Sequence, residues 1–262
     1  MNKNVIKYPL IIIVVVAVVY MVVSLLSGSR EDELYLYCGA GLRPVIDEVV
    51  AKFTEETGMS VRVDYNASNL LLGRIRVSGA GDLFIPGDEY YIQEAAKHGL
   101  IRDSWTVAAF VPVILVAAEN PKNIRTLTDL TRNGVKLGLA DERTAAIGRI
   151  SRMIFKRNDI PIETVEKNLI YDSVTVHELA TAVELGHIDA AIVWEPVATR
   201  YADLKIVRIP KERNVVAPVP VAVLESTRRE KPARQFVAFI LSQQSMSLFE
   251  KHHYGKWDNY HE

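Results

Sequence analysis

The chain has 262 residues and a formal net charge of −1, because its 31 Lys and Arg residues are scattered among 32 Asp and Glu residues. This near-neutral balance excludes the concentrated basic surface expected of a nucleic-acid-binding protein. The single cysteine, Cys38, excludes a scaffold held together by intrachain disulfides.

The first element along the chain is an uncharged apolar segment from Pro9 to Leu26, which two lysines precede. Its eighteen residues would span about 27 Å as a helix, close to a bilayer core of roughly 30 Å. We therefore expect residues 1–30 to form a hydrophobic membrane-anchoring helix or a signal peptide, and the rest of the chain to lie outside the cytoplasm. The small residues Ser27-Gly-Ser29 leave cleavage before Arg30 open as the alternative.

Strand and helix patterns alternate through the exported region, which predicts an α/β fold with largely parallel strands. An apolar strand that begins at Leu34 leads through a glycine-bearing turn into a helix between Pro44 and Gly58. Asp88 is the expected N-cap of a later helix at 89–98. Between these helices we expect, in chain order, a strand at 61–65, a helix at 70–77 and a strand at 82–85.

Two long apolar strands, at 110–118 and 215–223, suit crossings of the chain between two lobes. We expect one bilobed domain over residues 31–262, with a ligand cleft between the lobes. The expected boundaries give lobe 1 residues 32–108 and 222–262, and lobe 2 residues 109–221.

The turn after the first strand, Gly39-Ala-Gly41, is typical of an anion site. The first N–H groups of a helix have no intrahelical partner, and the helix start carries a partial positive charge. Similar junctions follow at 65–68 and at 139–145. Several helix starts that converge on one ligand would hold an anion without any Arg or Lys.

Two polar residues at these junctions have a structural and a functional interpretation. Ser68 either donates its hydroxyl to a ligand or is simply the N-cap of the following helix. Thr175 and Glu178 fit a reciprocal capping box, which would leave the N–H of Val176 free to point into the cleft.

From Leu34 to Tyr254 the sequence resembles the molybdate/tungstate-type periplasmic substrate-binding proteins of ABC importers. Its most specific motif is Gly79-Ala-Gly-Asp-Leu-Phe-Ile-Pro-Gly-Asp88, which is similar to a Gly-Ala-x-Ala-Asp-Leu-Phe-Ile-Ser-Ala-Asp run in that family. The other matching stretches, in family order, are Cys38-Gly-Ala-Gly-Leu42, Tyr65-Asn-Ala-Ser-Asn-Leu70, Leu139-Ala-Asp141, Ala146-Ile-Gly148 and Ala190-Ala-Ile-Val-Trp-Glu195.

The resemblance implies a two-lobed periplasmic-binding-protein fold that closes on a tetrahedral oxyanion and presents it to a membrane permease. The ligand contacts of the family fall on Gly41, Ser68, Ile147, Val176 and Trp194. The family usually has serine at the first position and tyrosine at the last. Here Gly41 offers only its backbone N–H, and Trp194 offers an indole N–H.

Glu195 directly follows Trp194, and Asp141 lies six residues before Ile147. A carboxylate repels a bound dianion, so both are expected to cap helices or face solvent. The alternative is that they coordinate the metal centre of the oxyanion, which would discriminate molybdate or tungstate from sulfate.

We therefore expect a monomeric binding protein that captures molybdate or tungstate, attached to the membrane by its N-terminal segment. Its partners would be an ABC permease and a separate ATPase subunit, because the chain has no P-loop motif. No catalytic residue, cofactor or resident metal is predicted, since hydrolase and zinc-protease motifs are missing and His252-His253 has no further ligand spaced nearby. The alternatives are a membrane-tethered oxyanion sensor, an enzyme that reuses the fold, and a binding protein for another anion or ferric iron.

Overall fold

The computed structural model describes residues 33–143 and 145–260. The predicted hydrophobic helix at the N-terminus therefore lies outside the described residues. Within the described ranges, no helix is both long enough and apolar enough to cross a membrane.

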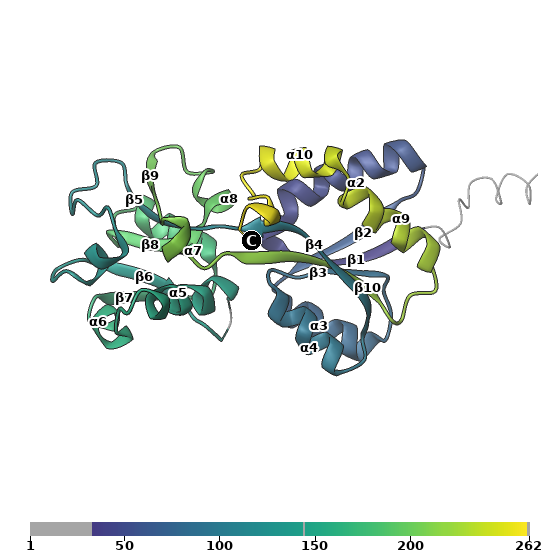
Figure 1. Ribbon diagram of the computed structural model, residues 1–262, viewed down its shortest axis with the longest axis horizontal. Helices are drawn as coiled ribbons and strands as arrows, with labels where there is room; N and C mark the ends of the chain where they lie inside the picture. The colour runs from purple at the N-terminus through teal and green to yellow at the C-terminus, as the bar shows by residue number, and fades with distance from the viewer. Residues whose placement is uncertain (1–32, 144, 261–262) are drawn as a thin grey trace, which may run out of the picture. The chain divides into compact units, whose positions relative to one another are not determined.

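Two five-stranded sheets form the frame of the domain, one in each lobe (Figure 1). The first has the order β2-β1-β3-β10-β4, with β1 at Leu34–Gly39, β2 at Val61–Asn66, β3 at Leu83–Ile85, β4 at Ile101–Phe110 and β10 at Ala217–Leu224. The second has the order β7-β6-β8-β5-β9, with β5 at Pro112–Ala117, β6 at Leu137–Ala140, β7 at Leu169–Ser173, β8 at Ala190–Trp194 and β9 at Leu204–Arg208. The two-lobed α/β periplasmic-binding-protein fold is confirmed.

Helices flank both sheets (Figure 1). Those of the first lobe are α2 at Arg43–Thr57, α3 at Ser68–Ser78, α4 at Glu89–Lys97, α9 at Glu230–Ile240 and α10 at Gln243–Lys251. Those of the second lobe are α5 at Ala146–Arg157, α6 at Ile162–Glu166, α7 at Val176–Glu184 and α8 at Glu195–Ala198. The 3-10 turns are η1 at Ala40–Leu42, η2 at Leu127–Thr131, η3 at Lys211–Arg213 and η4 at Trp257–Asn259.

The expectation of largely parallel strands is wrong for half of the strand pairings. β1 runs parallel to β2 and β3, and β6 runs parallel to β7 and β8. In contrast, β10 is antiparallel to β3 and β4, and β5 is antiparallel to β8 and β9. Two parallel strands need a crossover that returns the chain to the end of the sheet where the first strand began. β5 and β10 instead enter their sheets directly from the other lobe, and they run antiparallel to their neighbours.

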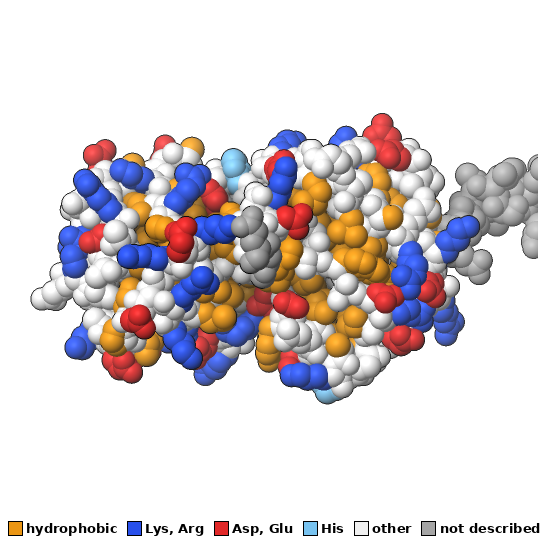
Figure 2. All heavy atoms as spheres, viewed as in Figure 1, with side chains coloured by type: hydrophobic (Ala, Val, Ile, Leu, Met, Phe, Trp, Pro, Cys, Tyr) orange, Lys and Arg blue, Asp and Glu red, His pale blue; other side chains and the backbone are white. Residues whose placement is uncertain are grey.

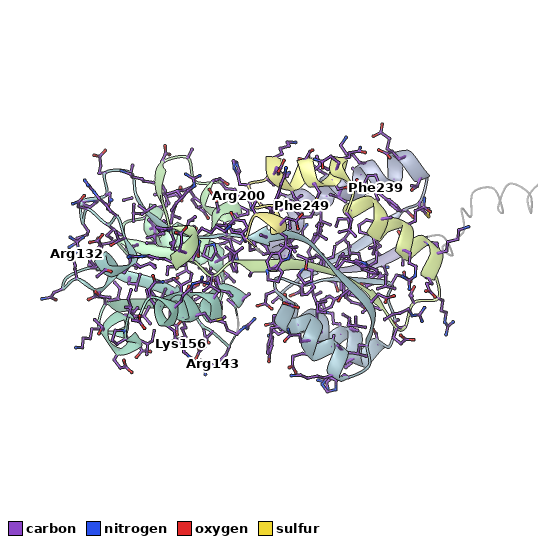
Figure 3. All side chains as sticks on the ribbon, viewed as in Figure 1. Arg132, Arg143, Lys156, Arg200, Phe239 and Phe249 are labelled. Carbon is purple, nitrogen blue, oxygen red and sulfur yellow. The ribbon has the colours of Figure 1, made fainter. Side chains whose placement is uncertain are left out.

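Helix α2 shows why the sequence folds locally as predicted. A proline lies in its first turn, and Gly58 ends it in the left-handed conformation at φ 72°. Its buried Phe53 packs edge-on against Phe236 and Phe239 of α9, with ring centroids 5.1 and 5.5 Å apart. Phe239 is labelled on this lobe in Figure 3. The helix is therefore fixed to the C-terminal part of the chain through aromatic packing.

The chain passes between the lobes at Val111 and again just before β10. Asn214, which is only 3% exposed, joins the two passages because its side-chain amide donates to the carbonyl of Pro112 at 2.9 Å. The side-chain oxygen of Asn214 accepts a hydrogen bond from the backbone N–H of Val215 at 2.9 Å. The lobe boundaries expected at 108/109 and 221/222 fall inside β4 and β10, a few residues from these passages.

We predict that Asn214→Ala lowers the free energy of unfolding by about 1–3 kcal/mol, because it leaves the buried Pro112 carbonyl without its donor. Urea denaturation of the ligand-free protein measures this change. Asn133→Ala is the matched control, since Asn133 is exposed in a turn, and it should change the value by less than about 0.5 kcal/mol. Equal effects of the two substitutions would contradict the role given to Asn214.

Candidate functional site: a cleft lined by helix starts

A cavity of about 390 Å³ lies between the two lobes. The first lobe lines it with Gly39, Ala40, Gly41, Leu42, Tyr65, Asn66, Ala67, Ser68, Gly87, Tyr91 and Phe110. The second lobe lines it with Ala145, Ala146, Val174, Thr175, Val176, His177 and Trp194. None of these described lining residues is an Arg, Lys, Asp or Glu, so an anion in the cavity would meet neutral groups.

Four helical segments begin at the wall of this cavity: η1, α3, α5 and α7. The backbone N–H groups of Gly41, Ser68, Ile147 and Val176 lie in their first turns, and none has an acceptor among residues 33–143 and 145–260. This is the expected state of first-turn N–H groups, which have no intrahelical partner. Of the five residues predicted to contact the ligand, Gly41, Ser68, Val176 and Trp194 line the cavity, and Ile147 does not.

Ile147 lies just behind the cavity wall. Its side chain is 1% exposed, and the two residues before it, Ala145 and Ala146, form the lining of that turn. Only its backbone N–H is placed to act at the start of α5.

Ser68 is not an N-cap, because α3 begins at Ser68 itself and Ala67 occupies the cap position. The Ser68 hydroxyl oxygen instead accepts from the N–H of Gly87 at 2.9 Å. A hydroxyl has one proton and two lone pairs, so its proton stays available to an acceptor in the cavity. Gly39 permits this arrangement, since a Cβ there would lie 3.2 Å from the nitrogen of Gly87.

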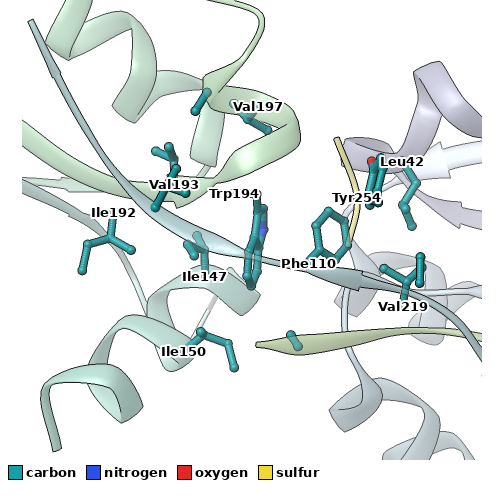
Figure 4. Close-up of a cluster of buried hydrophobic side chains, with 14 of the residues drawn as sticks. Leu42, Phe110, Ile147, Ile150, Ile192, Val193, Trp194, Val197, Val219 and Tyr254 are labelled. Atoms are coloured by element: carbon teal, nitrogen blue, oxygen red, sulfur yellow. The ribbon is translucent and has the colours of Figure 1, made fainter. Parts of the chain in front are cut away.

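Three aromatic rings extend from the cavity into the first lobe (Figure 4). The Trp194 ring packs on Phe110 with centroids 4.8 Å apart, and Phe110 packs on Tyr254 at 5.1 Å. The Tyr254 hydroxyl donates to the carbonyl of Gly41 at 3.1 Å. Burial raises the pKa of Tyr254, so its hydroxyl remains a donor at physiological pH and holds the glycine turn in place.

The predicted reciprocal capping box at α7 is wrong in one half. Thr175 does accept from the backbone N–H of Glu178, at 3.3 Å. The Glu178 carboxylate, however, accepts from the hydroxyl of Ser173 at 2.6 Å, and that same hydroxyl oxygen receives the N–H of Thr175. Ser173 therefore replaces the second arm of the box, and the N–H of Val176 still has no acceptor in the described part of the chain.

Asp141 and Glu195 do not line the cavity. The Asp141 carboxylate pairs with Arg143 at 2.5 Å, and these hydrogen bonds lower the pKa of Asp141 to about 2. Arg143 is labelled on the second lobe in Figure 3. Glu195 pairs with Arg208 at 2.6 Å. Both carboxylates thus have cationic partners, and their coordination of an oxyanion's metal centre stays a prediction.

His177 is a cavity residue that the sequence analysis missed. It is partly buried at the second position of α7, directly after Val176. Burial and then the charge of Arg200 lower the pKa of His177, so its ring is neutral at neutral pH and offers one N–H donor. Only its position next to Val176 in the sequence could have identified His177 as a cavity residue.

Within the described ranges, no group of three His, Cys, Asp or Glu residues could hold a metal ion. His252 lies 2.9 Å from the carboxylate of Glu48. On the face that Figure 2 shows, Lys and Arg side chains are interspersed with Asp and Glu.

Two α/β lobes that enclose a neutral, donor-lined cavity define a solute-binding protein. The family model "Bacterial extracellular solute-binding protein" matches residues 34–255, and the chain belongs to this family. The protein is therefore extracytoplasmic, and its family and fold are those of substrate-binding proteins, which are not enzymes.

A sequence relative supports the resemblance to the molybdate-type binding proteins of ABC importers, and two solved structures share the fold. The molybdate-binding protein ModA of Mycobacterium bovis is 27% identical over 88% of this chain and 86% of its own length. The Azotobacter vinelandii periplasmic molybdate-binding protein shares the fold with a TM-score of 0.68 at 16% identity, covering 84% of this chain and 98% of its own. The sulfate-binding protein SubI of Mycobacterium tuberculosis gives a TM-score of 0.76 at 20% identity, covering 86% and 87%.

We predict that Gly39→Ala lowers the free energy of unfolding by about 1–3 kcal/mol, because the new methyl group would crowd the backbone of Gly87. Gly41→Ala is the matched control, since a Cβ at Gly41 meets nothing within 4 Å. Thermal unfolding of both variants tests the difference. A Gly39→Ala variant as stable as Gly41→Ala would contradict the close approach of the two loops.

Proposed function

We propose that the protein captures molybdate or tungstate in the cavity between its lobes and delivers it to an ABC-type permease. The observation that carries this proposal is the set of first-turn N–H groups from both lobes that have no acceptor among residues 33–143 and 145–260, around a cavity whose described lining has no charged side chain. Under the same proposal the protein is a monomer, its N-terminal segment attaches it to the membrane, and a separate subunit hydrolyses ATP.

The number of donors is sufficient for useful affinity. A hydrogen bond to a charged group contributes about 1.5–3 kcal/mol, and micromolar binding requires about 8 kcal/mol. The cavity offers six donors: the four first-turn N–H groups, the Ser68 hydroxyl and the Trp194 indole N–H. Their summed contribution exceeds the free energy of micromolar binding before the costs of ordering and desolvation are subtracted.

The chemistry of the cavity favours a fully deprotonated dianion. Hydrogen phosphate carries a proton that needs an acceptor, and the described lining has no carboxylate to provide one. Ferric iron prefers anionic oxygen ligands. Tyr65 is poorly suited to be one, because its hydroxyl donates to Asp47 at 2.6 Å and burial raises the pKa of Tyr65.

The choice of molybdate or tungstate over sulfate rests on the ModA relatives, since the likeness to SubI extends to the fold alone. Calorimetric titration of the anion-free protein with molybdate, tungstate, sulfate and phosphate tests this choice. Micromolar or tighter binding of the first two, with sulfate much weaker and phosphate silent, is the expected result. Preference for sulfate would identify a different oxyanion, and no response to any of them would overturn the proposal.

Ser68→Ala should weaken molybdate binding by about tenfold, the effect of one lost charge-assisted hydrogen bond. The ligand-free protein should lose no more than about 1.5 kcal/mol of stability, because the lost bond to Gly87 is a neutral one. Calorimetry and urea denaturation separate the two effects. The exposed Ser104 provides the control substitution, Ser104→Ala, and an affinity equal to that control would remove Ser68 from the site.

Gly41→Ser should strengthen oxyanion binding, because the open space around this position accommodates a side chain and the added hydroxyl is a further donor. We expect a several-fold lower Kd for molybdate by calorimetry. Gly41→Ala controls for the added Cβ and should give no gain. A serine variant that binds no better than the alanine variant would place Gly41 away from the anion.

A further inference from the structure

Among residues 33–143 and 145–260, an ion pair joins the two lobes beside the cavity. Arg149 lies on α5 in the second lobe, and Asp88 lies at the start of α4 in the first lobe. A guanidinium N–H of Arg149 donates to the Asp88 carboxylate. The side chains are 24% and 7% exposed, so solvent screens this pair less than an ordinary surface ion pair.

The guanidinium of Arg149 is also held by other groups. It lies over the rings of Tyr90 and Tyr91 of α4, with 4.6 and 5.4 Å between the guanidinium carbon and the ring centroids. On its own lobe it donates to the carbonyl of Glu142 at 3.4 Å. Arg149 thus contacts the first lobe through one carboxylate and two aromatic faces, which defines its position more closely than the ion pair alone would.

Asp88 occupies the N-cap position of α4, as the sequence predicts. The backbone N–H groups of Tyr90 and Tyr91 in the first turn of α4 stabilise its carboxylate and act to lower its pKa. Its Oδ1 atom is buried and has no hydrogen-bond partner within the described ranges, while Oδ2 binds Arg149. Burial raises the pKa of Asp88 and the charge of Arg149 only partly offsets this, so removing Arg149 would leave a buried carboxylate without its cationic partner.

The location of the pair connects it to both halves of the cavity. Asp88 directly follows Gly87, whose N–H donates to the Ser68 hydroxyl oxygen. Arg149 lies in the first turns of α5, which begins with the cavity residue Ala146. The contact therefore links the loop that holds the Ser68 hydroxyl to the first turns of α5.

We propose that Asp88 and Arg149 are positioning residues, which hold the two lobes at the separation where one anion contacts the donors of both without touching the anion themselves. This inference rests on the proposed function. A ligand stabilises the closed arrangement only through contacts with both lobes, and the pair must break before the lobes separate. Its loss should therefore speed ligand release far more than it slows capture.

Stopped-flow tryptophan fluorescence with molybdate tests this inference on the full protein. Asp88→Asn and Arg149→Met should each raise the dissociation rate about tenfold, equivalent to about 1.4 kcal/mol, with association within about twofold of the unaltered protein. In the double variant, the fold-increase in the dissociation rate should be smaller than the product of the two single increases, because both substitutions remove the same interaction. Arg149→Lys keeps the charge but loses the planar fork and should give an intermediate rate.

Arg152→Gln is the matched control. Arg152 lies in the next turn of α5, and its partners Glu142 and Glu166 both belong to the second lobe. Its substitution should leave both rates unchanged. Unchanged dissociation in Asp88→Asn and Arg149→Met, or effects that multiply fully in the double variant, would overturn the proposal.

An interlobe distance measurement separates failure of this inference from failure of the proposed function. Spin labels on cysteines that replace the exposed Glu55 and Glu163 report the distance between the lobes. If molybdate, tungstate and sulfate all fail to bind, a longer or broader distance distribution in Arg149→Met than in Arg152→Gln would still support the pair as the element that positions the lobes. Identical distributions would refute it.

Discussion

The proposed function depends on one electrostatic constraint, which is that a dianion removed from water needs many hydrogen-bond donors around it. The cleft meets this constraint with backbone groups. Strands β1, β2, β6 and β7 end at the cleft, and η1, α3, α5 and α7 begin there. Because the carboxyl ends of parallel strands share one edge of a sheet, the fold brings helix starts to a single point from each lobe, and their first N–H groups have no acceptor in the described part of the chain. Charged side chains are not needed for this.

The remaining contacts around the cleft fix where these donors lie. Tyr254 holds the carbonyl of Gly41, and Gly87 orients the hydroxyl of Ser68. Asn214 joins the two passages of the chain between the lobes. The predicted function thus needs a site whose two halves are each rigid, and a small number of contacts that set the distance between them.

The sequence was sufficient for the two-lobed fold, because strand and helix periodicity is local and the motif from Gly79 to Asp88 is specific. It was insufficient where a side chain has two partners to choose from. Glu178 bonds to Ser173 instead of the backbone of Thr175, and Ser68 bonds to Gly87 instead of capping α3. No local pattern encodes the tertiary arrangement. The direction of strands β5 and β10 depends on it, and so does the contact between Asp88 and Arg149.

The most direct measurement of the central claim is a crystal structure of the protein grown with tungstate, with the anion located by the anomalous scattering of tungsten. The account predicts one strong peak in the cavity, with its oxygens within hydrogen-bonding distance of the Ser68 hydroxyl and of the N–H groups of Gly41, Ile147 and Val176. A cavity without tungsten under conditions in which calorimetry shows binding, or an anion held by Arg or Lys side chains elsewhere, would contradict the account.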